Sequence, residues 1–225
     1  NYLMALAYNT SGSVGGSGKG PFTFSISPSG SDRVLIAGVV YYHPNTTIDT
    51  ITFNSVALTE IPGSAYDPGG DYHLRWYYLI APNTGSNTFS YSFTGLGGTY
   101  DSGVVAYVFT GAHQTTPYGT VVKDTASSTT PSVTVSSATD EIVIDILIIT
   151  NVGTLTVGAG QTQRANAITP LAYIKYGGST EDGASSTTMS WSNSSSTFWV
   201  YSGLPVKPLS TTTTVRQLCL TGIGT

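Results

Sequence analysis

The sequence predicts an all-β protein, and three observations support that fold class. No window of about a dozen residues repeats apolar side chains at the i, i+3, i+4 spacing of a helix. Runs of β-branched and aromatic residues recur instead, separated by clusters of glycine, proline, asparagine and serine. Only 9% of the 225 residues are charged whereas 40% are hydrophobic, so the polar surface must come from uncharged side chains.

The predicted strands follow one another along the chain. Residues 22–26 alternate apolar and polar side chains, as a half-buried strand does, whereas 34–42 is almost continuously apolar. Residues 48–58 predict a hairpin whose turn is Asn54-Ser55. Further strands are expected at 72–80, 89–93, 104–109 and 142–149.

The strand pattern recurs in the second half of the chain. Residues 21–42 resemble 130–150, because in both an alternating strand leads through a serine-rich turn and an aspartate into a long apolar strand. Residues 87–93 similarly resemble 187–193, and each is followed by a strand with aromatic residues. The sequence therefore predicts a weak internal duplication.

The duplication favours a single large antiparallel β-sandwich over residues 1–209. Its pseudo-repeats, about 21–112 and 130–208, would place strands alternately in two sheets, as in a jelly roll. Two tandem small sandwiches, each with a core of its own, are the alternative. Pro205 and Pro208 interrupt strand pairing, so residues 210–225 are expected to form a separate, extended C-terminal arm.

Several segments carry a resemblance to known proteins. They are "SGSDRVLIAGVVYY", "ITFNSVALTEI", "RWYYLIAPNTGSNTFSYSFTG", "VVAYVFTGAHQTTPYG", "VGAGQTQR" and "WVYSGLPVKP". In this order they resemble β-sandwich modules of bacterial surface proteins and of virion structural proteins of tailed phages, over about residues 20–208. The resemblance implies a jelly-roll-like, non-catalytic module displayed outside a cell or on a particle. It brings no catalytic residues to this chain.

Charge and apolar patterning exclude two classes of partner. The net charge is −4 and only eight residues are lysine or arginine, so no basic patch for nucleic acid is expected. The longest apolar run, 142–149, is too short to cross a bilayer and contains Asp145, which indicates a buried strand rather than membrane insertion. A single cysteine allows neither an internal disulfide nor a zinc cluster.

The polar residues give little sign of catalysis. His43, His73 and His113 lie outside any nucleophile-elbow pattern, and no two carboxylates are paired by spacing as a glycosidase needs. We therefore expect no enzyme activity and no cofactor. Asp67 and Asp71 flank a Pro-Gly-Gly turn and are a weak candidate for a Ca²⁺ site, with a plain solvated turn as the alternative.

Aromatic residues on the strand 72–80 suggest a second kind of site. Alternation places Trp76 and Tyr78 on one face and Arg75 and Tyr77 on the other, so one of these faces belongs to the core. An exposed face could stack on sugar rings, which makes Trp76, Tyr77 and Tyr78 candidate glycan-stacking residues. The alternative is that the tyrosines simply cover a half-exposed sheet.

The predicted arm adds an unusual apolar segment after the duplicated pattern. Its candidate assembly residues are Val215, Leu218, Cys219, Leu220 and Ile223. Burial on a neighbour by strand addition, or on the same chain, would shield them, and a disordered tail is the remaining alternative. Cys219 is expected to act as a small buried hydrophobe.

Together these features predict a structural protein of a virion surface or another extracellular particle, such as a capsid decoration or a tail or fibre component. Its expected partners are copies of itself or other structural subunits. A secreted or cell-surface glycan-binding module, with surface glycans as its partners, is the alternative.

Overall fold

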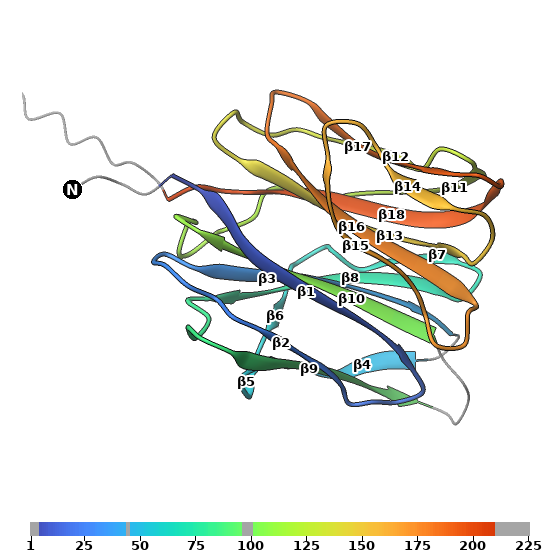
Figure 1. Ribbon diagram of the computed structural model, residues 1–225, viewed down its shortest axis with the longest axis horizontal. Coiled ribbons are helices and arrows are strands. Elements are labelled where there is room, and N and C mark those ends of the chain that lie inside the picture. The colour runs from blue at the N-terminus through green and yellow to red at the C-terminus, as the bar shows by residue number, and fades with distance from the viewer. Residues whose placement is uncertain (1–4, 44–45, 96–100, 210–225) are drawn as a thin grey trace, which may run out of the picture.

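The computed structural model describes residues 5–43, 46–95 and 101–209, and its regular elements are β-strands in antiparallel sheets (Figure 1). This confirms the predicted all-β, antiparallel sandwich class. No helix in the described parts of the chain is long and apolar enough to cross a membrane.

The first half of the chain forms two sheets. The inner sheet 1 has the order β1 (Ala7–Ser17), β10 (Asp101–Thr110), β3 (Val34–Tyr42), β8 (Tyr72–Ile80) and β6 (Thr59–Glu60), and β7 (Tyr66–Gly69) also pairs with β8. The outer sheet 1 has the order β2 (Phe22–Ile26), β9 (Asn87–Gly95), β4 (Thr46–Phe53) and β5 (Val56–Ala57).

The second half repeats this arrangement. The inner sheet 2 has the order β11 (Val122–Ser128), β18 (Thr197–Val206), β13 (Ile142–Thr150), β16 (Ile174–Asp182) and β15 (Thr162–Ile168). The outer sheet 2 has the order β12 (Ser132–Val135), β17 (Thr187–Asn193) and β14 (Leu155–Val157). The strands of the two sequence repeats thus occupy equivalent places: β2 and β3 correspond to β12 and β13, and β9 and β10 to β17 and β18.

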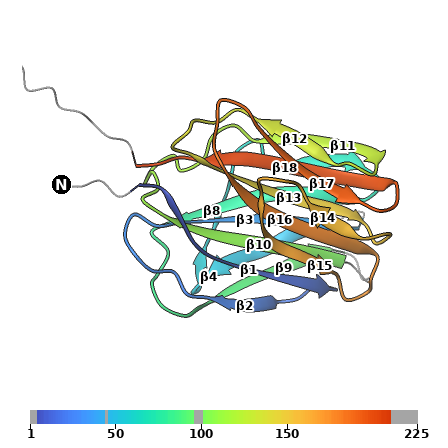
Figure 2. The same cartoon turned by 45° about the horizontal axis from the view of Figure 1, so that its top comes forward.

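The four sheets stack as layers, with the two inner sheets in the middle (Figures 1 and 2). Each sheet takes all its described strands from one half of the chain, so strands of the two halves do not alternate within a sheet as the sequence led us to expect. The reason is that β3 and β13 are apolar on both faces. One face of each inner sheet packs on its own outer sheet, and the other face packs on the opposite inner sheet.

Three apolar clusters fill the three spaces between the layers. Leu35 and Val39 of β3 pack with Phe89 beneath the outer sheet 1, whereas Ile36, between them, packs with Ile146 across the middle. Leu147 packs with the outer sheet 2 in a third cluster. The middle cluster contains residues of both halves, so the halves share a core and form one packed body.

Glycines allow the inner sheets to approach each other closely. A Cβ on Gly38 of β3 would lie 2.9 to 3.0 Å from side-chain atoms of Ile146, and one on Gly103 would lie 2.5 Å from the ring of Tyr176. Hydrogen bonds add to this contact. The indole Nε1 of Trp76 donates to Ser202 Oγ at 2.9 Å, and the hydroxyl of Tyr107 donates to the carbonyl oxygen of Asp145 at 2.6 Å.

The hairpin predicted at 48–58 is confirmed. β4 and β5 pair antiparallel, and their turn residues Asn54 and Ser55 both have positive φ, at 49° and 64°. Two consecutive residues with positive φ are typical of a type I′ turn, whose twist matches that of the flanking strands.

Candidate functional site

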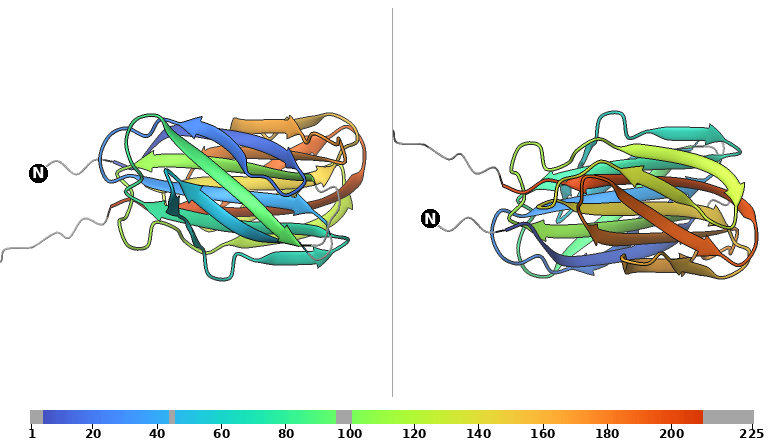
Figure 3. Two further views of the ribbon diagram at one scale, coloured as in Figure 1. Left: turned by 90° about the horizontal axis from the view of Figure 1, so that it is seen from below. Right: turned by 90° about the horizontal axis from the view of Figure 1, so that it is seen from above.

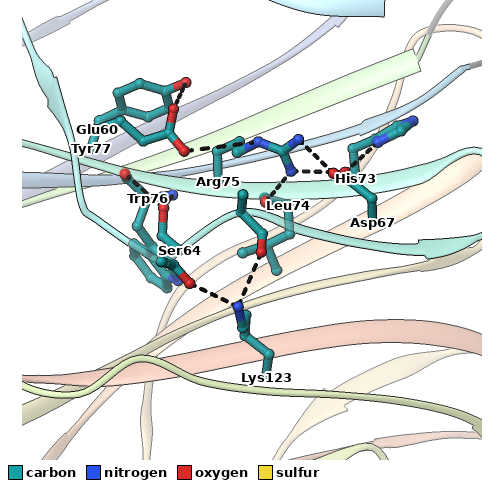
Figure 4. Close-up of polar contacts among 11 residues, drawn as sticks. Glu60, Ser64, Asp67, His73, Leu74, Arg75, Trp76, Tyr77 and Lys123 are labelled. Atoms are coloured by element: carbon teal, nitrogen blue, oxygen red, sulfur yellow. Dashed lines mark hydrogen bonds and ion pairs between the residues drawn. The ribbon is translucent and has the colours of Figure 1, made fainter. Parts of the chain in front are cut away.

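An ionic cluster lies on the face of β8 that points toward the outer sheet 1. Both guanidinium Nη atoms of Arg75 donate to the carboxylate of Asp67 on β7, at 2.8 and 2.7 Å, and His73 Nδ1 lies 2.6 Å from the same carboxylate (Figure 4). Partial burial alone would raise the pKa of Asp67, but the hydrogen bonds from Arg75 and His73 outweigh it and lower the pKa. Asp67 is therefore an ionised partner of these two side chains.

The ionic cluster includes Asp67, one of the two residues of the candidate calcium site at Asp67 and Asp71. Both oxygens of Asp67 are already bound by Arg75 or His73. Asp71 lies in the β7–β8 turn with a φ of 65°, and its carbonyl oxygen accepts a hydrogen bond from His43 N. Within the described residues, no group of three acidic, histidine or cysteine side chains gathers to hold a metal ion.

The cluster continues toward Glu60 on β6. Arg75 Nε lies 4.0 Å from Glu60 Oε1, and the hydroxyl of Tyr77 lies 3.5 Å from Glu60 Oε2 (Figure 4). Burial and the negative charge of Glu60 raise the pKa of Tyr77, so its phenol stays protonated and can donate.

A groove runs beside these residues, between β4 and the strands β6 and β8. It consists of two hollows, of about 170 and 260 Å³, that share Ile48 and Tyr77. The smaller hollow is also lined by Tyr41, Thr47, Glu60 and Arg75; the larger one is also lined by Asp49, Thr50, Ile51, Thr52, Ala57 and Leu58. We call this feature the Tyr77 groove.

The structure separates the three aromatic residues proposed for glycan stacking. Trp76 is 0% exposed and lies in the middle core, so it presents no ring face to a ligand and the expectation is wrong for this residue. Tyr78 is on the same face and packs edge-to-face against Tyr118, with ring centroids 5.0 Å apart. Tyr77 points the other way, is 8% exposed and lines the groove.

The second candidate surface is apolar and lies at one end of the molecule. Val152, Ile168, Leu171 and Tyr173 are four of the five exposed large hydrophobic side chains of the described chain, and Tyr173 is 56% exposed. Ile168 ends β15, Leu171 and Tyr173 lie in the β15–β16 turn, and Val152 lies in the β13–β14 connection. Asn151 N donates to the carbonyl oxygen of Tyr173 at 2.9 Å, which holds the two connections together. We call these four residues the apolar tip.

A buried carboxylate of the other half fixes the tip. Asp101, at the start of β10, is 0% exposed and accepts hydrogen bonds from Thr169 Oγ1 at 2.6 Å, Tyr173 N at 2.9 Å and Leu171 N at 3.2 Å. Because the backbone of the turn is bound in this way, the exposed side chains lie on a rigid support. No local pattern in the sequence indicates this contact, since Asp101 and the turn are far apart in the chain.

A second buried polar network surrounds Asp145 on β13. Its carboxylate accepts hydrogen bonds from Ser179 N at 2.6 Å, Ser179 Oγ at 2.8 Å, Trp191 Nε1 at 3.1 Å and Gln161 Nε2 at 3.2 Å, and from the hydroxyl of Tyr201. Burial raises the pKa of Asp145 to about 6, and these hydrogen bonds limit the rise. The carboxylate is fully enclosed, so its role is internal.

A further cavity, of about 400 Å³, lies where the start of β1 meets β15 and β16. Tyr8 lines it, but the guanidinium of Arg164 lies 3.5 Å from the centroid of the tyrosine ring and covers that ring face. Burial and the charge of Asp182 raise the pKa of Glu181 in the same cavity.

Comparison with models of protein families, with curated proteins and with solved structures finds no match to this chain. The candidate arm residues Val215, Leu218, Cys219, Leu220 and Ile223 lie outside the described residues.

Proposed function

We propose that this chain is a non-catalytic structural subunit that assembles end to end on the surface of an extracellular particle, with a virion as the leading case. The observation that carries the proposal is the apolar tip of Val152, Ile168, Leu171 and Tyr173. The hydrogen bond between Asn151 and Tyr173 joins the two chain segments that carry these exposed side chains, and exposed apolar surface is typical of protein–protein contacts.

The rigidity of the tip supports a binding role. Asp101 and Asn151 hold the backbone of the β15–β16 turn through hydrogen bonds. The turn is therefore already ordered before a partner docks on it. Preorganisation lowers the entropy that association costs, and a small apolar surface gains affinity from it.

The position of the tip favours a head-to-tail contact with a second copy of the chain. The tip lies beside Thr150 and Ile174, whereas Leu209, where the described chain ends, lies beside Gly111 at the other end of the sheets (Figures 1 and 3). The apolar arm predicted after Leu209 therefore starts far from the tip of its own chain. We infer that the arm of one copy covers the tip of the next, a heterologous contact that repeats into rings or filaments.

The sheet architecture supports the particle-surface part of the proposal. In each half the first strand lies beside the last, and the last lies beside the third, with the second and second-to-last strands paired in the other sheet. This interleaved order supports a jelly-roll assignment for each half, and jelly rolls are common among viral capsid domains. The uncharged polar composition of the chain fits a displayed surface.

The test uses full-length variants and light scattering over a range of protein concentrations. Changing Leu171 and Tyr173 together to serine removes the tip, and changing Leu218 and Leu220 together to serine removes the apolar arm. Val56→Ser is the matched control, because Val56 is also exposed, at 48%, but lies on the β4–β5 hairpin. We expect the wild type and the control to associate, and each double variant to be monomeric.

A mixture of the two double variants distinguishes contact between copies from contact within one chain. One variant keeps an intact arm and the other an intact tip, so the mixture should form dimers and nothing larger. A mixture that stays monomeric, or a wild type that is monomeric at all concentrations, would overturn the proposal.

A further inference from the structure

We propose that the Tyr77 groove binds a neutral polysaccharide, with one sugar ring in each of its two hollows. This site lies in the first half of the molecule, on different strands from the apolar tip. Its function does not depend on end-to-end assembly.

The floor of the groove suits the apolar face of a sugar ring. Tyr77 and Ile48 line both hollows, and Ala57 and Leu58 extend the apolar lining of the larger one. Sugar rings carry C–H groups on their faces, which pack on aromatic and aliphatic side chains while the hydroxyls point to the sides.

The walls supply hydrogen-bonding groups of both kinds. Glu60 is the main acceptor, since its side chain is 45% exposed and lies beside Tyr77 and Arg75. Thr47 lines the same hollow, and its hydroxyl pairs with that of Thr94 at 3.0 Å, so the pair can accept from or donate to a ligand hydroxyl. Asp49 and Thr50 line the larger hollow.

The ionic cluster behind the groove holds these groups in place. Asp67 binds Arg75 through both Nη atoms, and Arg75 Nε faces Glu60, so the glutamate has a fixed neighbour before any ligand arrives. Ser64 Oγ accepts from Trp76 N at 3.1 Å, and Lys123 Nζ donates to the carbonyl oxygens of Gly63 and Ala65 at 2.7 and 3.0 Å (Figure 4). These bonds tie the segment between β6 and β7 to β8 and to the second half.

The charges select against an acidic ligand. Glu60 and Asp49 are carboxylates that line the groove, and the cation that lines it, Arg75, is already neutralised by Asp67. An acidic polysaccharide would bring a like charge next to Glu60 and Asp49, whereas a neutral one would bring hydroxyl donors.

The experiment measures binding of the full-length protein to soluble polysaccharides by affinity electrophoresis and titration calorimetry. The neutral probes are xyloglucan, galactomannan and dextran, and the acidic probe is polygalacturonate. We expect saturable binding of at least one neutral probe, and none of the acidic probe. Glu60→Gln keeps the size of the side chain but removes its charge, and should weaken binding roughly tenfold.

A matched control comes from the second half. Thr134 and Thr188 form an exposed hydroxyl pair at 3.1 Å, like Thr47 and Thr94, but far from the groove. Thr47→Val should weaken binding and Thr134→Val should not, with unchanged thermal unfolding for both. The proposal fails if no neutral probe binds saturably, or if Glu60→Gln and Thr47→Val bind as the wild type does.

Discussion

The two halves of the molecule build their inner sheets on equivalent strands but fill the space behind them differently. Ala37 and Asp145 are each the fourth residue of a nine-residue strand, β3 and β13, and both are fully buried. In the first half, Ala37 lies opposite Tyr77 in an apolar core. In the second half, Asp145 is bound by Ser179, Trp191 and Tyr201. The same scaffold therefore accepts either an apolar contact or a buried carboxylate network.

The aromatic residues of the outer sheets show how the second core adapts. Tyr91 on β9 and Trp191 on β17 occupy equivalent places in the repeat. The hydroxyl of Tyr91 lies 3.0 Å from Ser102 Oγ, whereas the indole Nε1 of Trp191 donates to Asp145. Each polar atom reaches a partner in the inner sheet, as buried polar atoms must. The two cores therefore share hydrogen-bonded polar atoms at these positions rather than the same residue types.

The largest expected effect comes from making the second half resemble the first. Asp145→Ala leaves Ser179 N, Trp191 Nε1 and the hydroxyl of Tyr201 buried without their acceptor, which should lower the free energy of unfolding by about 3–5 kcal/mol. Denaturant unfolding at pH 7 measures it. Asp124→Ala is the control, because Asp124 is an exposed carboxylate on β11 and its loss should change stability by less than about 0.5 kcal/mol. If Asp145→Ala lowered the free energy of unfolding as little as the control does, the buried carboxylate network would not be what distinguishes the second core from the first.

The second effect concerns pH and belongs to the second half alone. The pKa of Asp145 is raised from 3.8 to about 6, so folding favours its protonated form. Its contribution to stability is fully present below the unfolded value and is lost as the pH rises through about 6, which amounts to about 2 kcal/mol between pH 4 and 7. Asp145→Asn removes the titrating group and should flatten this part of the pH dependence.

Other groups titrate in the same range, so the measurement is the difference in pH dependence between wild type and Asp145→Asn. An NMR titration of the Asp145 carboxyl in the wild type checks the same point without a variant. A carboxyl that titrates near 4, as an exposed aspartate does, would contradict the prediction.

The smallest effect tests the contact between the halves. Gly38→Ala places a methyl group 2.9 to 3.0 Å from Cδ1, Cβ and Cγ2 of Ile146, so overpacking should cost about 1–3 kcal/mol. Because the middle core is shared, unfolding should remain a single transition rather than split into two. Combining Gly38→Ala with Ile146→Ala makes room for the methyl group, and the double variant should be less destabilised than the sum of the single changes. Additive effects would show that these two residues are not coupled.

Local patterns in the sequence predicted the strands well. The segments 22–26, 34–42 and 72–80 coincide with β2, β3 and β8, and the turn at Asn54-Ser55 is confirmed. These features depend on alternation and turn chemistry over a few residues, which a single sequence displays. The duplication was visible for the same reason, since it repeats local patterns.

The arrangement of the sheets could not be predicted from such local sequence patterns. A strand that is apolar on both faces, such as 34–42, looks the same whether a sheet of its own half or of the other half covers it. The strand 72–80 has aromatic residues on both faces, so periodicity could not tell that Trp76 faces the middle core and Tyr77 the groove. The partners of Asp67 and Asp101 depend on strand pairing and on contact between the halves, neither of which is local.

The shared middle core has a consequence for synthesis of the chain. The face of the inner sheet 1 that carries Ile36, Leu74 and Trp76 is covered by residues of the second half. Translation proceeds at about 5–20 residues per second, so a ribosome needs on the order of 5–20 s to produce the residues that cover it. During that interval the apolar face of the nascent first half lacks its cover, and transiently exposed apolar surface of this kind is prone to aggregation.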